Sequence, residues 1–217
     1  MSNEFSYRLE TKDDYDEMER LTRDAFWDVY RPGCDEHYLL HTMRDAACYI
    51  PELSFLCVAP AGALAPAGAL APEGELAGGI YCTEAIIRDG TTDHVVVCVG
   101  PIAVAPAYQK RGIGQALLDL ACERAGELGY PCAVLFGNPG YYHRAGFTDA
   151  KNFGIHLADG SDMEAFMCRP IDREKLKGVR GNYQEDAVFS IDQQAMEEFD
   201  RRFPPREKHV LPTQIFK

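Results

Sequence analysis

The sequence predicts an α/β protein in which helices flank a mixed, mostly antiparallel central sheet. Two apolar segments, 76–87 and 95–104, are separated by the turn signal Asp89-Gly90, which predicts an antiparallel hairpin. The second segment leads through a glycine-rich turn into a segment of helical spacing that starts at Gly112. A short apolar run, 133–136, follows that helix and is expected to be a buried strand parallel to the preceding one.

The segments before this hairpin alternate between strand and helix. Residues 7–9 are expected to form a strand, and Thr11 with Asp14 is typical of a helix N-terminus. Apolar residues then recur at helical spacing up to Phe26, and a second helix is predicted for residues 35–46. Residues 53–58 are predicted to form the strand that precedes the hairpin.

The later segments close the fold. The helix after Gly112 is expected to bury one apolar face, consisting of Ile113, Ala116, Leu117, Leu120, Ala121 and Leu128. A short helix is predicted for 141–145, and segments 152–157 and 165–168 are interpreted as a closing hairpin. The C-terminal part is less periodic, but it contains an acidic helix candidate at 192–202.

Composition excludes several classes of protein. The chain has 34 Asp and Glu against 22 Lys and Arg, a net charge of −12, which argues against a nucleic-acid partner. It lacks an apolar run of about 18 residues, so no transmembrane helix is predicted. Its start, MSNEFSYRLE, lacks the basic and apolar regions of a signal peptide. We therefore expect a cytoplasmic protein without a membrane partner.

The cysteines and histidines do not predict a metal site. None of the eight cysteines forms a C-x-x-C pair, and several lie inside apolar runs, so we expect reduced, buried thiols. His37 and His41 are four residues apart on a predicted helix, but Tyr38 stands where a zinc-protease helix needs glutamate. We expect no metal cofactor.

A six-residue repeat interrupts the strand region. PAGALA occurs at Pro60 and again at Pro66, and PEGELA follows at Pro72. Three copies of this composition are too short and too rich in glycine and proline for a solenoid, and they resemble a flexible linker. We expect residues 59–77 to be an insertion between two strands.

The glycine-rich turn is the strongest functional signal. Gln109, Gly112 and Gly114 stand in the order Q-x-x-G-x-G between a strand and a helix. Glycines allow close approach of the backbone to a ligand, and the free N–H groups of a helix start bind anions. Lys110 and Arg111 add positive charge. The turn therefore predicts a pyrophosphate site, although it lacks the Lys-Ser/Thr of a P-loop.

This turn resembles the acetyl-CoA loop of the GNAT superfamily of N-acetyltransferases. The segment FGNPGYYHRAGF, residues 136–147, resembles a second motif of that family, in which an aromatic residue and a tyrosine precede x-x-x-G-F. The resemblance covers about residues 6–170, and PGCDEHYLLH and FPPREKHVLP are similar to phrases in a little-characterised bacterial branch of predicted acetyltransferases. It implies a sheet that is splayed at the acetyl-CoA slot, and acetyl-CoA as co-substrate.

The resemblance also implies where coenzyme A and the leaving thiolate are held. The general acid would be Tyr142, five residues before Phe147, and Gly100-Pro101 stands where a bulge would widen the slot. Coenzyme A would contact Ile102, Ala103, Val104, Gln109, Lys110, Arg111, Gly112, Ile113, Gly114, Gln115, Asn138 and Tyr142.

The acceptor side and the general base are less defined. The first two helices of the family roof the acceptor site, which implies that Trp27, Tyr30, Glu36 and His37 lie near the substrate. Some family members carry a glutamate on the strand before the loop, but here no carboxylate occurs between His94 and Tyr108. Glu84, His94 and a water chain are the open alternatives for the base.

We therefore expect an N-acetyltransferase that acts on a primary amine of a small molecule or peptide. Residues 1–170 would form its domain, and residues 171–217 a C-terminal extension packing on it, in a monomer or homodimer. Two other classes stay open: a non-catalytic acyl-CoA sensor on the same fold, and a nucleotide-binding domain that uses the glycine loop.

Overall fold

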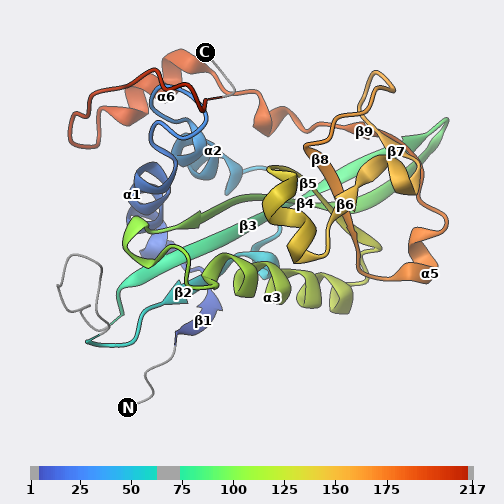
Figure 1. Cartoon of the computed structure of the whole chain (residues 1–217), viewed down its shortest axis with the longest axis horizontal. Helices are drawn as coiled ribbons and strands as arrows, with labels where there is room; N and C mark the ends of the chain where they lie inside the picture. The colour runs from blue at the N-terminus through green and yellow to red at the C-terminus, as the bar shows by residue number, and fades with distance from the viewer. Residues whose placement is uncertain (1–4, 63–73, 215–217) are drawn as a thin grey trace.

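The computed structural model describes residues 5–62 and 74–214, within which nine strands form one mixed sheet (Figure 1). The main path of the sheet runs β1-β2-β3-β4-β5-β8-β6, and β9 joins β3 and pairs with β7. The strands are β1 (Ser6–Leu9), β2 (Phe55–Val58), β3 (Leu76–Asp89), β4 (Thr92–Val104), β5 (Cys132–Phe136), β6 (Thr148–Asp149), β7 (Ile155–His156), β8 (Phe166–Pro170) and β9 (Gly181–Gln184).

The centre of the sheet confirms the predicted strand order. The strands β3 and β4 form the long antiparallel hairpin, from Asp89 paired with Thr92 to Gly78 paired with Val104. The next strand, β5, lies parallel to β4, as expected for a short apolar strand that follows a crossover helix. Since the other pairs on the main path are antiparallel, the sheet is mixed and mostly antiparallel.

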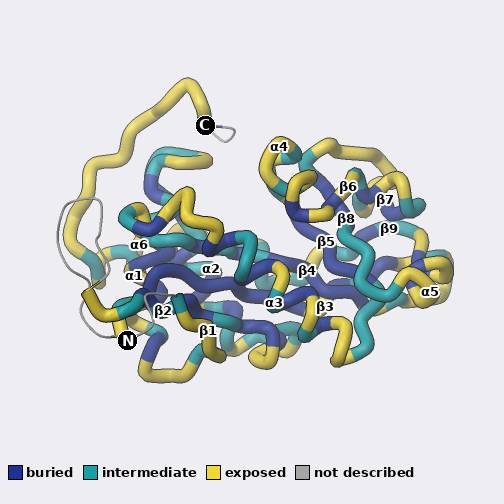
Figure 2. Tube along the Cα trace, turned by 60° about the horizontal axis from the view of Figure 1, so that its bottom comes forward, coloured by how far each residue is buried: buried dark blue, intermediate teal, exposed yellow. Residues whose placement is uncertain are grey.

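Helices cover both faces of the sheet. On one face α3 packs against β2, β3 and β4, and on the other α1 and α2 pack over Leu56, Tyr81 and Ala103 (Figures 1 and 2). The helices are α1 (Tyr15–Phe26), α2 (Glu36–Met43), α3 (Ile113–Leu128), α4 (Pro139–Tyr142), α5 (Arg173–Leu176) and α6 (Gln193–Asp200). The predicted N-terminal signature is present, since Thr11 N–H donates to Asp14 over 2.8 Å.

The buried face of α3 is wider than the one expected. Leu118, Cys122 and Ala125 are buried, whereas Leu128 is 42% exposed at the end of the helix and Leu120 is half-buried. The helix packs against the sheet and against the segment that carries Ala145 and Phe147, so it buries a wider stripe than a single row of residues. The prediction for Leu128 was therefore wrong, and those for Ile113, Leu117 and Ala121 are confirmed.

The expected closing hairpin does not form. Residues 155–156 pair in parallel with β9, and β8 instead pairs with β5 and β6. The error arose because β9 lies in the less periodic C-terminal part, where no strand was predicted. From there the chain continues to α6, which confirms the expected acidic helix and contacts α2. The proposed division between 1–170 and 171–217 stays a prediction.

Two sequence predictions concern the insertion and the thiols. Within the predicted insertion at 59–77, residues 63–73 lie outside the described residues, so the flexible linker stays a prediction. The eight cysteines are free, and all of them except the half-buried Cys48 are buried, as predicted.

A buried ion cluster holds the α1–α2 layer on the sheet. Arg44 pairs with Glu10 over 2.6 Å and with Glu19 over 2.9 Å, and all three side chains are at most 3% exposed. Tyr81 of β3 donates its hydroxyl to Glu10 over 2.7 Å. Because each buried charge has a charged partner, the cluster fixes how both helices sit over the sheet.

Candidate active site

A splay between β4 and β5 opens the centre of the sheet. These strands pair only at Val97 with Ala133 and at Cys98 with Val134, although β4 continues to Val104. Opposite Tyr81, β4 has the two residues Gly100 and Pro101, which is the bulge expected at that position. Beyond Cys98 the backbone edge of β4 that faces β5 is therefore left without a strand partner.

The glycine loop lies at the end of this unpaired edge. Gly112 caps α3 in the left-handed conformation (φ 83°), and a Cβ placed on it would meet no atom within 4 Å. Lys110 also has positive φ (64°), and Gln109 ties the loop to the strand by donating to the carbonyl of Val104 over 3.2 Å. The first N–H groups of α3 thus face an open backbone cradle.

The side chains around the cradle differ in what they offer. Lys110 and Arg111 are exposed, and Arg111 lies 5.3 Å from the ring of Tyr108, which anchors the loop by donating to Glu75 over 2.7 Å. Ile113 and Ala103 are buried in the core, so only their backbone groups are available to a ligand. Ile102 and Val104 are half-buried.

Two further residues that were predicted to contact coenzyme A form side-chain hydrogen bonds within the protein. The amide of Gln115 donates to Asp119 over 2.9 Å. The side chain of Asn138 accepts from Gly140 N–H over 2.8 Å and caps α4. In this arrangement Asn138 positions the short helix that carries the two tyrosines.

Both tyrosines of α4 approach the slot, but at different places. The hydroxyl of Tyr141 lies over Gly114, where a Cβ would come within 2.7 Å of it. The ring of Tyr142 lies over Gly137, where a Cβ would overlap with it, and packs edge-on against Phe147 at 5.9 Å. Sequence reasoning missed the contact of Tyr141 with the glycine loop, because no pattern in the chain indicates it.

Tyr142 is electrostatically coupled to Tyr30, which follows α1. Burial raises the pKa of Tyr142, and the phenols of Tyr30 and Tyr141 raise it further. The phenol therefore keeps its proton at neutral pH. Burial, followed by the charge of Glu36, also raises the pKa of Tyr30.

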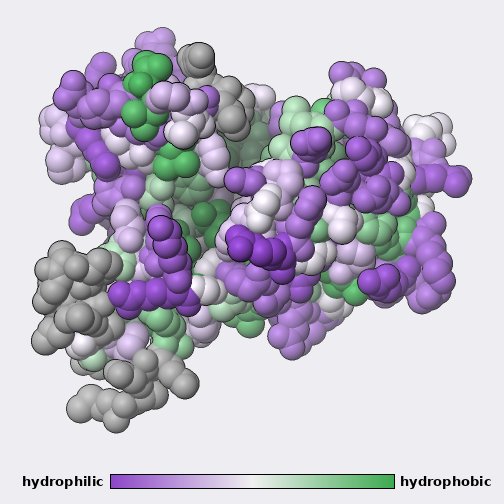
Figure 3. Space-filling model, in the orientation of Figure 1, coloured by the Kyte–Doolittle hydropathy of each residue, from purple (hydrophilic) through white to green (hydrophobic). Residues whose placement is uncertain are grey.

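The surface of the molecule is hollowed near its middle. Figure 3 shows this hollow between the side of the molecule that carries α1, α2 and α6 and the opposite side, with apolar side chains at its floor.

The structure places both candidate bases on the β3–β4 hairpin. Glu84 pairs with Val97, next to the point where β4 and β5 part, and accepts from Tyr130 over 2.7 Å. His94 pairs with Ile87 near the hairpin turn, about 16 Å along the strand from Val99. Glu84, His94 and a water chain stay predictions for the base.

Of the predicted acceptor-side residues, two have roles within the protein. Trp27 is 7% exposed, and its Nε1 donates to the carbonyl of Glu207 over 3.0 Å. His37 is fully buried, with Nε2 2.9 Å from Asp200, and burial lowers its pKa to about 4. Both side chains hold the C-terminal segment against the first two helices.

The other two predicted acceptor-side residues are Tyr30 and Glu36, and Glu36 Oε2 accepts from Asp35 N–H over 3.2 Å. Tyr30 is 37% exposed and its ring lies 6.0 Å from that of Phe26. Glu36, the first residue of α2, is half-buried. Burial, and then the negative charge of Asp35, raises the pKa of Glu36 to about 7.

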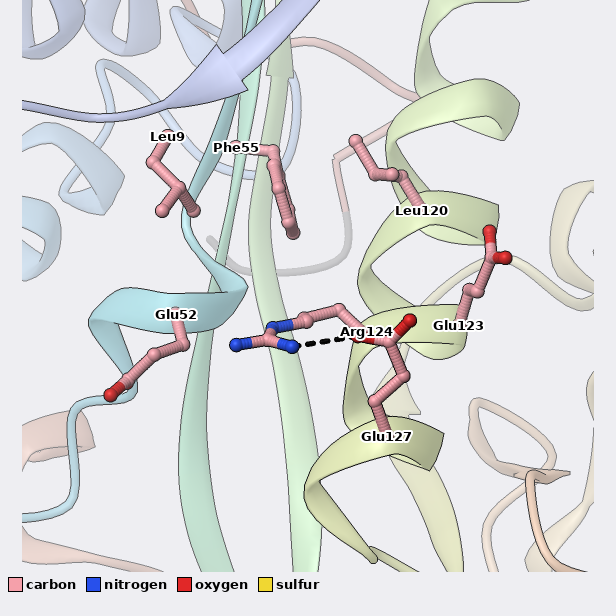
Figure 4. Close-up of a pocket in the computed structure, with 7 residues that line it drawn as sticks. All are labelled: Leu9, Glu52, Phe55, Leu120, Glu123, Arg124 and Glu127. Carbon is pink, nitrogen blue, oxygen red and sulfur yellow. Dashed lines mark hydrogen bonds and ion pairs between the residues drawn. The ribbon is translucent and has the colours of Figure 1, made fainter.

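A second hollow, of about 420 Å³, lies between α3 and the strands β1 and β2 (Figure 4). Arg124 pairs there with Glu127 over 2.6 Å, and the hollow contains neither the glycine loop nor the tyrosines of α4. Its lining residues are Leu9, Glu52, Phe55, Leu120, Glu123, Arg124 and Glu127. Among the described residues, no group of three or more His, Cys, Asp or Glu side chains could hold a metal ion.

Comparison with known proteins agrees with the geometry of the slot. Residues 71–149 match the family model of the acetyltransferase (GNAT) domain, and this segment contains the hairpin, the glycine loop and both tyrosines. No curated protein matches the sequence. Among the described residues, no helix is long and apolar enough to cross a membrane.

Solved structures share the fold. The GNAT family N-acetyltransferase YhbS of Escherichia coli, in complex with CoA, is 21% identical with a TM-score of 0.73, covering 88% of this chain and 94% of its own. A GNAT acetyltransferase of Brucella melitensis, in complex with acetyl-CoA, is 23% identical with a TM-score of 0.62 (87% and 99%). A chain of the NatC complex bound to Gag peptide and CoA is 17% identical with a TM-score of 0.52, and the match covers 77% of this chain and 98% of that one.

The segment that matches the acetyltransferase domain model thus contains the edge of β4 at the splay and the glycine loop. These structures share the fold of this chain, and the match to the GNAT domain model is confined to residues 71–149.

Proposed function

We propose that the protein transfers the acetyl group of acetyl-CoA directly to a primary amine of a small molecule or peptide. The observation that carries this proposal is the splay between β4 and β5, with the glycine loop at the end of the unpaired edge of β4. The structures similar in fold include one bound to a peptide and CoA, which supports an amine of this kind.

The residues of the slot fit coenzyme A. The cradle at Gly112 has open space above it and free helix N–H groups, which suits a pyrophosphate. The unpaired edge of β4 around Ile102 and Val104 offers backbone hydrogen bonds of the kind that a pantetheine amide can use. When bound, acetyl-CoA supplies the acetyl group as an activated thioester.

Tyr142 would then serve as the general acid. A phenol is protonated at neutral pH, and burial raises the pKa of Tyr142 further, so the resting enzyme holds a proton that a departing thiolate could take. Positioned proton transfer of this kind contributes typically about 10²–10⁴-fold to a rate.

A non-catalytic acyl-CoA sensor is the second candidate. One observation favours it: β4 carries no carboxylate between His94 and the loop, and Glu84 is turned to Tyr130. A sensor would bind coenzyme A by the same cradle but would not consume acetyl-CoA in the presence of an amine.

The two candidates are separated by an amine panel with release of free CoA thiol as the readout. The panel contains alkylamines, phenylethylamine, a lysine-containing peptide and a peptide with a free N-terminus. Thiol release that depends on one of these amines, with the acetylated product seen by mass spectrometry, supports the transferase. Binding of acetyl-CoA without turnover by any of them supports the sensor.

A further inference from the structure

One edge of the central sheet is open. The strand β1 ends the main path of the sheet, and all four of its residues are exposed. Glu10 N–H donates to the carbonyl of Ser54 over 2.9 Å, which fixes the hydrogen-bonded positions of the β1–β2 pair. Because such positions alternate along an antiparallel pair, the backbone groups of Tyr7 and Leu9 point away from β2. The carbonyl of Leu9 accepts from Arg8 over 3.1 Å, and among the described residues no strand pairs with this edge.

The apolar side chains of this edge lie on the face of the sheet that α3 covers. Leu9 stands opposite Phe55, which packs against the core under α3, and Tyr7 shares its face of the strand. Both side chains are exposed, Tyr7 by 37% and Leu9 by 45%. Leu9, Phe55 and Leu120 form the apolar side of the neighbouring hollow of about 420 Å³ (Figure 4). A strand added at this edge, about 4.8 Å from β1, would cover these apolar groups.

The other side of the hollow is acidic. Glu52, Glu123 and Glu127 line it together with Arg124, which extends from α3 towards Glu52. Among the residues drawn in Figure 4, the one ion pair is that of Arg124 with Glu127, over 2.6 Å. The carboxylates of Glu52 and Glu123 are exposed and are left for a cation from outside. The hollow therefore offers apolar contact next to β1 and negative charge beyond it.

We propose that β1 and this hollow together bind an extended segment of a partner protein, which adds an antiparallel strand to the sheet. The residues of the segment opposite Tyr7 and Leu9 exchange backbone hydrogen bonds with them and direct their side chains to the hollow. Apolar residues fit these two positions, because they meet Leu9, Phe55 and Leu120. A lysine or arginine two residues further on the same face then lies at the acidic side of the hollow.

Charge selects a basic partner over a second copy of the chain. Pairing of β1 with β1 about a two-fold axis would place two acidic hollows side by side on one face of the joined sheet. The whole chain carries a net charge of −12, which attracts a basic segment and repels a copy of itself.

The probe is the fluorescein-labelled peptide KTVTVTK, whose lysines and valines share one face of a strand in either direction. Fluorescence anisotropy should show saturable binding to the full-length protein. The peptide ETVTVTE, in which glutamate replaces lysine, should bind at least about ten-fold more weakly. N-methylation of the valines should abolish binding, because it blocks the N–H groups that face β1, whereas N-methylation of the threonines should preserve it.

Matched variants test the acidic side of the hollow. Glu52→Lys combined with Glu123→Lys should weaken binding of KTVTVTK by about ten-fold or more, because the lysines of the peptide then meet like charges. Glu197→Lys combined with Glu198→Lys changes the net charge equally on exposed residues of α6 and should leave the affinity within about two-fold.

Hydrogen exchange followed by NMR locates the bound peptide. In the free protein the amides of Tyr7 and Leu9 should exchange faster than that of Glu10, which donates to Ser54. Binding of KTVTVTK should slow the exchange of both.

Several results would overturn the proposal. Without saturable binding of KTVTVTK at millimolar concentration, the edge is not a docking site for a basic strand. Equal weakening in the two double variants would show that net charge alone attracts the peptide. Binding that survives N-methylation of the valines, or that leaves the exchange of Tyr7 and Leu9 unchanged, would place the peptide elsewhere. If light scattering shows a dimer of the free protein that Leu9→Asp separates, a second copy occupies the edge instead.

Discussion

At the scale of single residues, the adjacent tyrosines of α4 are directed to different partners. Tyr141 places its hydroxyl over Gly114 in the glycine loop, whereas Tyr142 packs on Gly137 and couples to Tyr30. The glycines at 114 and 137 are thus required by close approach of a tyrosine, and the two phenols should contribute to different kinetic parameters.

We predict that Tyr142→Phe lowers kcat by about 10²-fold or more and leaves CoA affinity within a few-fold. The ring still packs against Phe147, so only the proton donor is lost, and an interaction made in the transition state changes kcat more than binding. Steady-state kinetics and calorimetry measure the two quantities.

Tyr141→Phe is the control for this prediction. Its hydroxyl touches the loop and not the acceptor side, so it should change CoA affinity by a few-fold and leave kcat nearly unchanged. A large loss of kcat in Tyr141→Phe with little effect in Tyr142→Phe would exchange the roles of the two tyrosines. If neither matters, the thiolate takes its proton elsewhere.

A second residue-scale prediction concerns Gly112. Gly112→Leu should weaken CoA binding by about 100-fold, because the new side chain enters the open space over the helix N–H groups. Gly90→Leu is a matched control in the hairpin turn, since Gly90 also has positive φ and no neighbour within 4 Å of its Cβ. Both variants should lose about 1–2 kcal/mol of unfolding free energy from the left-handed conformation. Equal CoA affinities by calorimetry would refute the loop assignment.

At the scale of elements, the position of α1 and α2 over the sheet depends on the buried cluster around Arg44. Arg44→Leu should destabilise the protein by about 3–5 kcal/mol, because it leaves the carboxylate of Glu10 buried without its cation and removes the buried cation beside Glu19. Urea unfolding at neutral pH measures the difference.

The control for Arg44 is an exposed ion pair. Arg124→Leu breaks a contact of 2.6 Å to Glu127, with both side chains more than 40% exposed, and should cost no more than about 1 kcal/mol. A comparable loss of unfolding free energy in the two variants would show that burial of the charges has no part in holding α1 and α2 on the sheet.

Several elements could be predicted from sequence because a local physical signal defined each. The β3–β4 hairpin has the Asp89-Gly90 turn, and α3 has Gly112 before it and Gly129 after it, both in the left-handed conformation. The pairing of β7 with β9 could not be predicted, because both strands are short and lie far apart in sequence. The burial of Leu118 and Cys122 depends on the loop that packs against α3, which periodicity alone does not reveal.

The predictions for the site also differ between a local motif and residues that are far apart in sequence. The glycine loop is contiguous, so its motif predicted an element that the structure forms, with Gly112 at the start of α3. The predicted acceptor side would draw on the loop after α1, the start of α2 and α4, and no sequence spacing relates these segments. No local pattern therefore identifies the base, and Glu84, His94 and a water chain stay predictions.

At the scale of the whole molecule, different helices cover the two faces of the sheet. The α3 face builds the core and presents the glycine loop, while α1 and α2 on the other face are held by α6 and the segment after it (Figure 1). The slot lies where β4 and β5 part between these layers. A ligand that fills the slot therefore contacts elements from both layers and should stabilise the entire fold.

The measurement that tests this account most directly is a thermal-shift titration with CoA, acetyl-CoA, ATP and NAD. At a ligand concentration 100-fold above Kd, the linkage amounts to about 2.7 kcal/mol. For a domain of this size that raises Tm by about 5–10 °C. We predict this rise for CoA and acetyl-CoA, its absence for ATP and NAD, and its loss in Gly112→Leu but not in Gly90→Leu. No shift at millimolar CoA, or an equal shift with ATP, would contradict the assignment of the β4–β5 splay as a coenzyme A site.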